Sequence, residues 1–277
     1  MEHVNLVITS LFTALLSPFS PLSPIWGLLA ISLAAGVLLA LLYGKLSNQR
    51  ALKKVKRSIS AGIFESVLFR HDLKTSLKAQ AAMLWGGVKY FSLAIPPILV
   101  LIIPSVVVLA QLNLRYGARA LQSGEVAVVT LRMKNEDALF EAEVTAPQGV
   151  DITPPLRDLD HLEVSWRIDN RRSITMASPS TSWLAISVAG ASASQPLYLK
   201  SQPALLPTQL HTNPWWQFLY PGGSVPETLR AYVSSISITY PEQVMSLSGV
   251  HTNWLVLFAL VSIVAGFVAS RIFGIEI

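Results

Sequence analysis

The side chains that most often carry catalysis or bind metals are few in this sequence and widely spaced. Its five histidines stand at positions 3, 71, 161, 211 and 251, and no two of them have the spacing of a metal-binding pair. Asp158 and Asp160 are close together, but in a polar segment where solvated carboxylates are expected. There is no cysteine, which excludes disulfides and thiolate metal sites. We therefore predict a protein that is not an enzyme and uses no cofactor or metal.

The strongest chemical feature is positive charge concentrated in one short segment. Residues 45–89 carry ten Lys/Arg against two carboxylates, whereas residues 112–253 carry ten against twelve. A basic surface of this kind attracts anionic lipid headgroups or an acidic partner. Lys53, Lys54, Lys56 and Arg57 are therefore candidate contacts to a client or partner protein. The alternative is that the charge serves only to orient the chain in a membrane. A formal net charge of +5 over 277 residues gives no reason to expect nucleic-acid binding.

The chain contains three long apolar stretches, two of which flank the basic segment. Ile25–Tyr43, Tyr90–Ala110 and Trp254–Phe273 are each close to the roughly 20 helical residues that a bilayer core requires. Only 13% of the residues are charged, against about 25% in average soluble domains. We predict an integral membrane protein with transmembrane helices over 25–43, 90–112 and 253–277, the last with a short tail. Their central parts lack ionisable residues, which argues against a transporter.

The uneven charge also predicts an orientation. By the positive-inside rule, residues 44–89 and the carboxyl terminus are cytoplasmic, and the amino terminus and residues 113–252 are extracytoplasmic. The bacterial inner membrane is the expected location. Within residues 1–24, the apolar run Val4–Phe19 is too short to span. We predict an interfacial or re-entrant helix on the outer side, the alternative being a fourth span.

Small residues recur at every fourth position in two of the spans. This spacing places a smooth stripe on one helix face, where a second backbone can approach closely. We predict that these stripes pack on each other within one chain, the alternative being oligomerisation. The residues are Ser32, Gly36, Ala40 and Gly44 in the first span and Ser262, Gly266 and Ser270 in the third.

The second span contains three prolines and ends in polar residues. Pro96, Pro97 and Pro104 predict a bend near its cytoplasmic end, packed against protein, because proline removes helical hydrogen bonds. Polar residues at two-residue steps then suggest an interface or the start of an extended segment. These residues, further candidate contacts, are Gln111, Asn113 and Arg115.

The basic segment itself shows helical periodicity in two runs. The break lies at residues 70–72, where Asp72 is a favourable N-cap. We predict a short antiparallel coiled coil with its basic residues outside. The seam residues would be Leu52, Val55, Ile59, Ile63 and Val67 in the first arm and Leu73, Leu77, Ala81, Leu84 and Val88 in the second.

Beyond the second span the periodicity changes to two, which is typical of strands. We predict an antiparallel β-sandwich over residues 113–202, immunoglobulin-like in general architecture. The strand candidates are Glu125–Met133, Ala138–Thr145, His161–Ile168, Trp183–Val188 and Pro196–Lys200. The expected fold class is thus an α+β membrane protein.

Residues 203–252 are predicted to link the sandwich back to the membrane. They contain a short aromatic helix and one more strand, Ser234–Thr239. Trp215 and Trp216, together with Trp254 at the start of the last span, are candidate interfacial anchors. A place in the sandwich core is the alternative for the first two.

This order of elements resembles the YidC/Oxa superfamily of membrane insertases, especially its short three-span members. The resemblance rests on Ile25–Ala110 and Trp254–Phe273, with residues 47–72 standing where the family has its coiled-coil hairpin. It implies a groove, open to the cytoplasm, that guides hydrophobic segments into the bilayer. The family's outer loop is usually short, whereas here it holds a β-domain.

Two hypotheses on function follow. In the first, the protein is a non-catalytic factor for membrane-protein insertion or complex assembly, and the hairpin and second span bind the client. In the second, it is a structural accessory subunit of a cell-envelope complex and grips its partner through the β-domain. Both require the lipid bilayer and other membrane proteins as partners.

Overall fold

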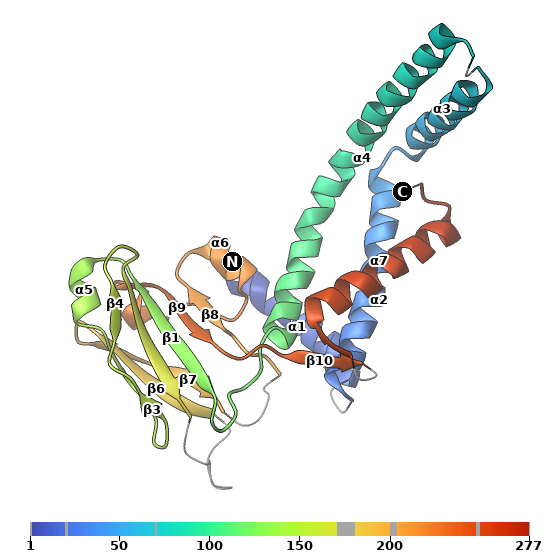
Figure 1. Ribbon diagram of the computed structural model, residues 1–277. Coiled ribbons are helices and arrows are strands. Elements are labelled where there is room, and N and C mark those ends of the chain that lie inside the picture. The colour runs from blue at the N-terminus through green and yellow to red at the C-terminus, as the bar shows by residue number, and fades with distance from the viewer. Residues whose placement is uncertain are drawn as a thin grey trace. The chain divides into compact units, whose positions relative to one another are not determined.

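The computed structural model describes residues 2–19, 22–69, 71–170, 181–199, 204–247 and 250–276. The chain divides into two compact units (Figure 1). The β unit comprises Met1–Ile25 and Val107–Trp254, and the helical unit comprises Trp26–Val106 and Leu255–Ile277. The structure combines helices with antiparallel sheet and has three long apolar helices, as the predicted α+β class requires.

Most of the β unit is formed by two antiparallel sheets. In the larger sheet the strand order is β3-β5-β1-β9-β8, with β4 also paired to β5; the smaller sheet has the order β2-β6-β7. The strands of the larger sheet are β1 (Val126–Met133), β3 (Asp151–Ile152), β4 (Leu156–Asp158), β5 (Glu163–Asp169), β8 (Gln209–His211) and β9 (Val233–Thr239). Those of the smaller sheet are β2 (Glu143–Thr145), β6 (Thr181–Val188) and β7 (Ala191–Tyr198).

Both sheets contribute side chains to one hydrophobic core. Along β1, alternate side chains are buried, from Ala127 to Met133, as the period of two predicts. Val129 and Leu131 lie in the same cluster as Ile186 of β6 and Ile236 of β9. Because β9 pairs with β1 throughout, the sheet continues past residue 202 into the segment that we expected to be a linker.

The sequence prediction was wrong at Ala138–Thr145, which is not one strand. A short helix, α5 (Glu136–Phe140), comes first, and β2 follows it. Glu136 and Asp137 lie in the first turn of α5, where carboxylates stabilise the helix dipole. The other strand candidates are present with shifted ends, and Lys200 lies outside the described residues. Two further strands, β10 (Val244–Leu247) and β11 (Val250–Asn253), form a separate hairpin.

Three helices are long and apolar enough to cross a membrane. They are α2 (Pro24–Leu46), α4 (Leu73–Tyr116) and α7 (Trp254–Phe273). The second is a single helix of 44 residues that continues through Pro96, Pro97 and Pro104, so the prolines do not divide it into two helices; the bend predicted there stays a prediction. The remaining helices are α1 (Glu2–Leu16), η1 (Ser17–Phe19), α3 (Gln49–Leu68), α6 (Pro214–Leu219) and η2 (Glu227–Leu229).

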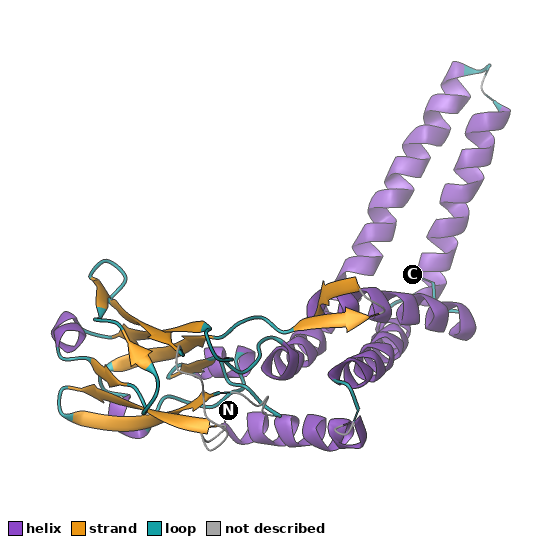
Figure 2. Cartoon of the chain, turned by 60° about the horizontal axis from the view of Figure 1, so that its bottom comes forward, coloured by secondary structure: helices purple, strands orange, loops and turns teal. Residues whose placement is uncertain are grey.

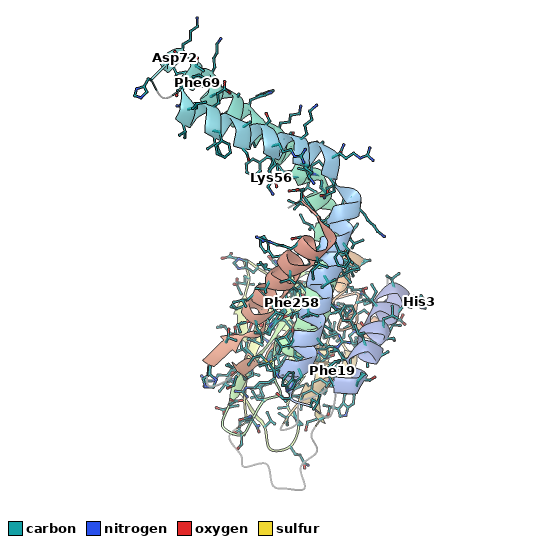
Figure 3. The ribbon with its side chains drawn as sticks, turned by 90° about the vertical axis from the view of Figure 1, so that its right-hand side faces the viewer. His3, Phe19, Lys56, Phe69, Asp72 and Phe258 are labelled. Atoms are coloured by element: carbon teal, nitrogen blue, oxygen red, sulfur yellow. The ribbon has the colours of Figure 1, made fainter. Side chains whose placement is uncertain are left out.

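The predicted helical hairpin is present: α3 and the first part of α4 lie side by side (Figure 1, Figure 2). Phe69 and Asp72 mark its tip in Figure 3, and the Asp72 carboxylate accepts a hydrogen bond from the Lys74 backbone N–H, as expected of an N-cap. Arg70 lies outside the described residues. Asn48 caps α3 in the same way, accepting from the Ala51 N–H.

The seam of the hairpin matches the prediction in part: Leu52 and Val55 of the first arm are buried and Ile59 faces Gly86, whereas Ile63 and Val67 are exposed. Small residues also form it: a β-carbon at Gly62 would lie 2.7 Å from Met83 Cγ, and one at Gly86 would lie 2.8 Å from Ile59 Cγ1. Ala79, between them on α4, is only 2% exposed. The seam residues proposed for the second arm, from Leu77 to Val88, lie on exposed positions instead. Glycine and alanine bring the helices close together, and the larger apolar residues of α4 face away.

Candidate functional site

The small residues predicted to pack the spans together do so within the chain. A β-carbon at Gly36 of α2 would collide with the backbone carbonyl oxygen of Ser262 on α7, and one at Gly266 would lie 3.4 Å from the Gly36 carbonyl oxygen. Ser32, Ala40 and Ser270 are also buried. The Ser32 hydroxyl donates to the Leu28 carbonyl at 2.6 Å, which satisfies it inside the interface.

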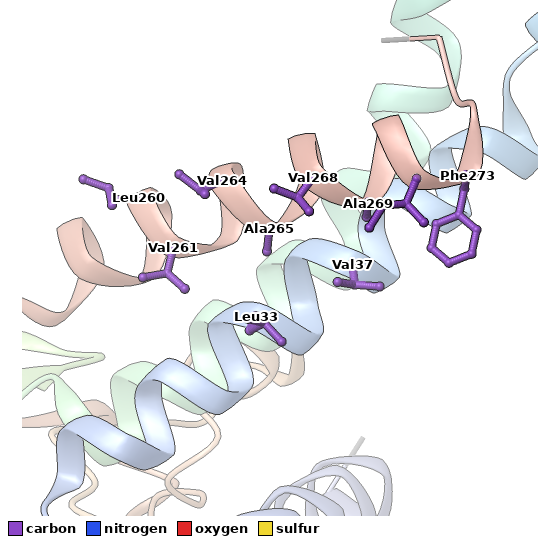
Figure 4. Close-up of a pocket in the computed structure, with 10 residues that line it drawn as sticks. Leu33, Val37, Leu260, Val261, Val264, Ala265, Val268, Ala269 and Phe273 are labelled. Atoms are coloured by element: carbon purple, nitrogen blue, oxygen red, sulfur yellow. The ribbon is translucent and has the colours of Figure 1, made fainter.

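Beside this crossing, α2 and α7 border an apolar groove (Figure 4). Its volume is about 420 Å³, and Leu33, Val37, Val264 and Val268 are among its lining residues. The lining side chains are hydrocarbon throughout, so the groove has no polar group that could orient a polar ligand.

The fourth small residue of α2, Gly44, accommodates the carboxyl-terminal segment. A β-carbon at Gly44 would lie 2.9 Å from Ile275 Cδ1. Ile275 packs against a cluster that includes Tyr43 of α2 and Leu52 of α3. Next to it, the Glu276 N–H donates to Gln49 Oε1 at 2.7 Å. The end of the chain thus connects the base of the hairpin to α2, a contact that the sequence analysis did not predict.

The four basic candidates on α3 lie on its exposed side. Lys56 pairs with Glu276 at 2.9 Å, and this hydrogen bond lowers the pKa of the Glu276 carboxyl and raises that of the Lys56 amine. Figure 3 shows Lys56 toward the base of the hairpin. Lys53, Lys54 and Arg57 are exposed on the same helix. The helix therefore presents a basic face, with one lysine also used to hold the chain end.

The outer face of α4 carries a continuous apolar stripe, which we call the α4 stripe. Its residues follow one another in alternating steps of four and three, the heptad spacing of helices that pair in coiled coils. Ala81 is exposed, and the larger members are between 48% and 75% exposed. The stripe consists of Leu77, Ala81, Leu84, Val88, Phe91, Ile95, Ile98 and Ile102.

At the other end of α4, two of the three polar candidates are buried against α1. Gln111 is 2% exposed and Arg115 8%. The Arg115 guanidinium donates to Gln111 Oε1 at 2.8 Å, Thr13 Oγ1 at 2.9 Å and the Thr9 carbonyl at 3.1 Å. Gln111 Nε2 donates to Thr9 Oγ1 at 3.0 Å, and the ring of Phe12 lies 5.8 Å from the guanidinium carbon.

These contacts show that Gln111 and Arg115 hold α1 and do not face outward to a partner. Because α4 continues as a helix to Tyr116, residues 111 and 115 share one face, and no extended segment begins here. Asn113 lies on another face, is partly exposed and borders a small cavity with Leu114 and Pro207. The polar stripe Asn5, Thr9 and Thr13 of α1, at four-residue spacing, was the signal that sequence reasoning missed.

The three tryptophans expected at an interface differ in exposure. Trp215 of α6 is 73% exposed, as an anchor would be. Trp216 is half exposed and stacks on the imidazole of His211, with ring centroids 5.7 Å apart. Burial in this cluster lowers the pKa of His211. Trp254 is only 8% exposed, so little of its indole is left to contact lipid.

Among the titratable side chains of the β unit, Asp158 and His161 form a pair at its surface. The imidazole Nδ1 lies 2.9 Å from Asp158 Oδ2. This hydrogen bond raises the pKa of His161 and lowers that of Asp158. The two side chains are 67% and 49% exposed, so the pair is a surface contact. Across the described residues, no three His, Asp or Glu side chains are grouped so that they could hold a metal ion.

Comparison with known proteins supplies no relative: no protein-family model, curated protein or solved structure matches this chain.

Proposed function

We propose that the protein is a non-catalytic integral membrane protein that binds apolar helices of other membrane proteins during their insertion or assembly. The α4 stripe is the proposed binding surface. This is the role that the resemblance to YidC/Oxa insertases implies, with one uncovered helix in place of a groove that opens to the cytoplasm.

The single observation that carries this proposal is the continuity of the α4 stripe. A straight helix of 44 residues is about 66 Å long, roughly twice the hydrocarbon thickness of a bilayer. The stripe runs without interruption from the basic hairpin, at Leu77, into the most apolar part of the helix, at Ile102. A client helix could therefore pair with the hairpin and slide along the same stripe into the lipid. Basic residues beside it would attract acidic flanks of the client.

The proposed topology follows from the charge distribution. The helices α2, α4 and α7 span the membrane, here taken to be the bacterial inner membrane. The hairpin is cytoplasmic and the two sheets, packed as a sandwich, are extracytoplasmic. The ten basic residues of segment 45–89 support this orientation, because positive charge is retained on the cytoplasmic side.

Site-specific photocrosslinking tests the proposal. A photoreactive amino acid at Leu84 or Val88, within the stripe, should crosslink to several membrane proteins during their synthesis. At Ala82 or Lys89, exposed neighbours one position beyond the stripe, crosslinking should be at least several-fold weaker. Equal yields at all four positions would contradict the assignment of the stripe. A single constant partner would exclude the insertion role.

A second candidate function is that of a structural accessory subunit. It is supported by apolar side chains exposed on the β unit, with Phe140 61% and Leu156 75% exposed. The guanidinium of Arg157, the residue after Leu156, lies 6.0 Å from the ring of Phe140 at the end of α5. In this role these apolar side chains would contact one fixed partner in the cell envelope.

Co-purification in mild detergent separates the two functions. The accessory role predicts a stoichiometric partner that is lost in Phe140→Ser together with Leu156→Ser. The matched control is Leu84→Ser, which should leave that partner bound. Recovery of the protein alone in every case would refute the accessory role.

A further inference from the structure

The amino-terminal helix α1 is amphipathic, with polar residues toward the protein and apolar residues outward. This is the reverse of a helix on the surface of a soluble domain. Three of its polar side chains contact the protein: Asn5 Nδ2 donates to the Gln217 carbonyl of α6 at 2.7 Å, and Thr9 and Thr13 accept from α4. His3 and Ser10 are exposed. Its apolar side chains point outward. These residues are Val4, Val7, Leu11 and Leu15, between 50% and 63% exposed.

The spacing along α1 explains why the two sets separate. Positions 5, 9 and 13 follow one another at four-residue steps, and positions 4, 7, 11 and 15 at steps of three or four. At 3.6 residues per turn, Thr9 and Leu11 lie on opposite faces. A contiguous aliphatic face of this kind, left uncovered, marks a contact surface.

From this arrangement we propose that the outward face of α1 lies in the lipid headgroup–acyl boundary of the outer leaflet, with Arg115 as the residue that positions it. The face carries no charged side chain, which suits hydrocarbon better than a typical protein partner. Leu16 precedes Pro24 by eight residues, so the chain can separate α1 from α2 by at most about 29 Å. Trp215, on the neighbouring α6, supplies the exposed indole that membrane interfaces favour.

This arrangement differs from the usual interfacial helix, which places Lys or Arg among the headgroups on its polar side. Here the polar residues that contact the protein, Asn5, Thr9 and Thr13, are neutral, and the Arg115 guanidinium binds the last two. Attachment of α1 should therefore not depend on anionic lipid. The inference uses the proposed span α2 but is independent of the helix-binding role of the α4 stripe.

Because the chain has no cysteine, single-cysteine labelling tests the proposal directly. Leu11→Cys is labelled with nitrobenzoxadiazole, whose fluorescence depends on its surroundings. The fluorescence is measured in phosphatidylcholine vesicles that contain lipids spin-labelled at either a shallow or a deep acyl position. We expect blue-shifted emission and at least twofold stronger quenching by the shallow spin label, unchanged when phosphatidylglycerol is added. Controls are Ser194→Cys, exposed on β7 and expected to be unquenched, and Leu260→Cys on α7, expected to respond to the lipid quenchers.

The alternative outcomes are distinct. Quenching of the Leu11 label by aqueous iodide, to the extent seen for the Ser194 label, would overturn the proposal. Protection of the Leu11 label from both the spin-labelled lipids and iodide would also overturn it, because it would mean that protein covers the face. If Leu260 responds to lipid quenchers while Leu11 does not, the membrane assignment stands and this inference fails. In the Arg115→Leu background the shallow-to-deep ratio should change at least twofold, and Arg115→Lys should restore part of it. The wild-type labelling decides the question even if Arg115→Leu does not fold.

Discussion

At the scale of single residues, Gly36 and Arg115 show two different requirements for placing apolar helices side by side. Gly36 matters because it has no side chain: the Ser262 carbonyl occupies the space that a β-carbon would need. Arg115 matters because its long side chain reaches four oxygen atoms, all of them uncharged, on α4 and α1. A buried guanidinium is tolerated when such acceptors replace water.

The crossing of α2 and α7 gives a matched pair of glycine substitutions. Gly36→Ala should destabilise the helical unit by about 1–3 kcal/mol, because a backbone carbonyl cannot move aside as a side chain can. Gly87→Ala on α4 meets no atom within 4 Å and should be neutral or stabilising by about 0.5–1 kcal/mol. Thermal unfolding in detergent would measure both, and equal midpoints would contradict the packing described here.

The Asp158–His161 pair predicts a pH dependence at the surface of the β unit. The pKa of His161 should exceed the ordinary value of 6.5, since the Asp158 carboxylate binds the protonated imidazole. The associated stabilisation is complete below the ordinary pKa and is lost as the pH rises through the raised one. The lowered pKa of Asp158 sets the lower end of the pH range in which the pair is stabilising. Below it the carboxylate is protonated, so the contribution of Asp158 to stability is lost as the pH falls through that pKa. Titration of His161 by NMR should show this, with Asp158→Asn returning the pKa to the ordinary range; identical curves would rule the pair out.

At the scale of elements, the hairpin and the carboxyl-terminal segment depend on packing more than on charge. The Lys56–Glu276 pair is exposed at the lysine, and such pairs contribute at most about 1 kcal/mol. Ile275 instead inserts its side chain beside Gly44 and Leu52. The joint between α2 and the hairpin is therefore mainly hydrophobic.

Substitutions at the chain end separate these two contributions. Ile275→Ala should lower the free energy of unfolding by about 1–2 kcal/mol, because a partly buried isoleucine loses much of its apolar contact. Glu276→Gln should cost less, and its effect should shrink further in high salt. Chemical unfolding monitored by fluorescence would compare the two variants, and a larger loss for Glu276→Gln would show that the ion pair dominates.

The elements also show what could be read from the sequence. The long apolar helices, the hairpin with its turn near Asp72, and the alternation along β1 follow from strong local periodicity. The seam of the hairpin could be found only in part, at Leu52, Val55 and Ile59. Gly62, Ala79 and Gly86 also form it, and hydrophobicity patterns do not single out such small residues. The role of Arg115 also escaped prediction, since its partners Thr9 and Thr13 lie about a hundred residues away in the chain.

At the scale of the whole molecule, the proposed account uses three surfaces: the basic face of α3, the α4 stripe and the outward face of α1. The proposed account assigns the first two to the cytoplasm and the lipid through which a client helix passes. The third would be assigned to the opposite side of the membrane. All three assignments depend on the orientation of the chain, so orientation is the central claim.

The most direct test of that claim is cysteine accessibility in sealed, right-side-out membrane vesicles. Ser58→Cys on α3 and Ser194→Cys on β7 are both exposed positions in a chain that otherwise lacks cysteine. A membrane-impermeant maleimide should label Ser194→Cys at once and Ser58→Cys only after detergent is added. Immediate labelling of Ser58→Cys, with Ser194→Cys protected, would contradict the account.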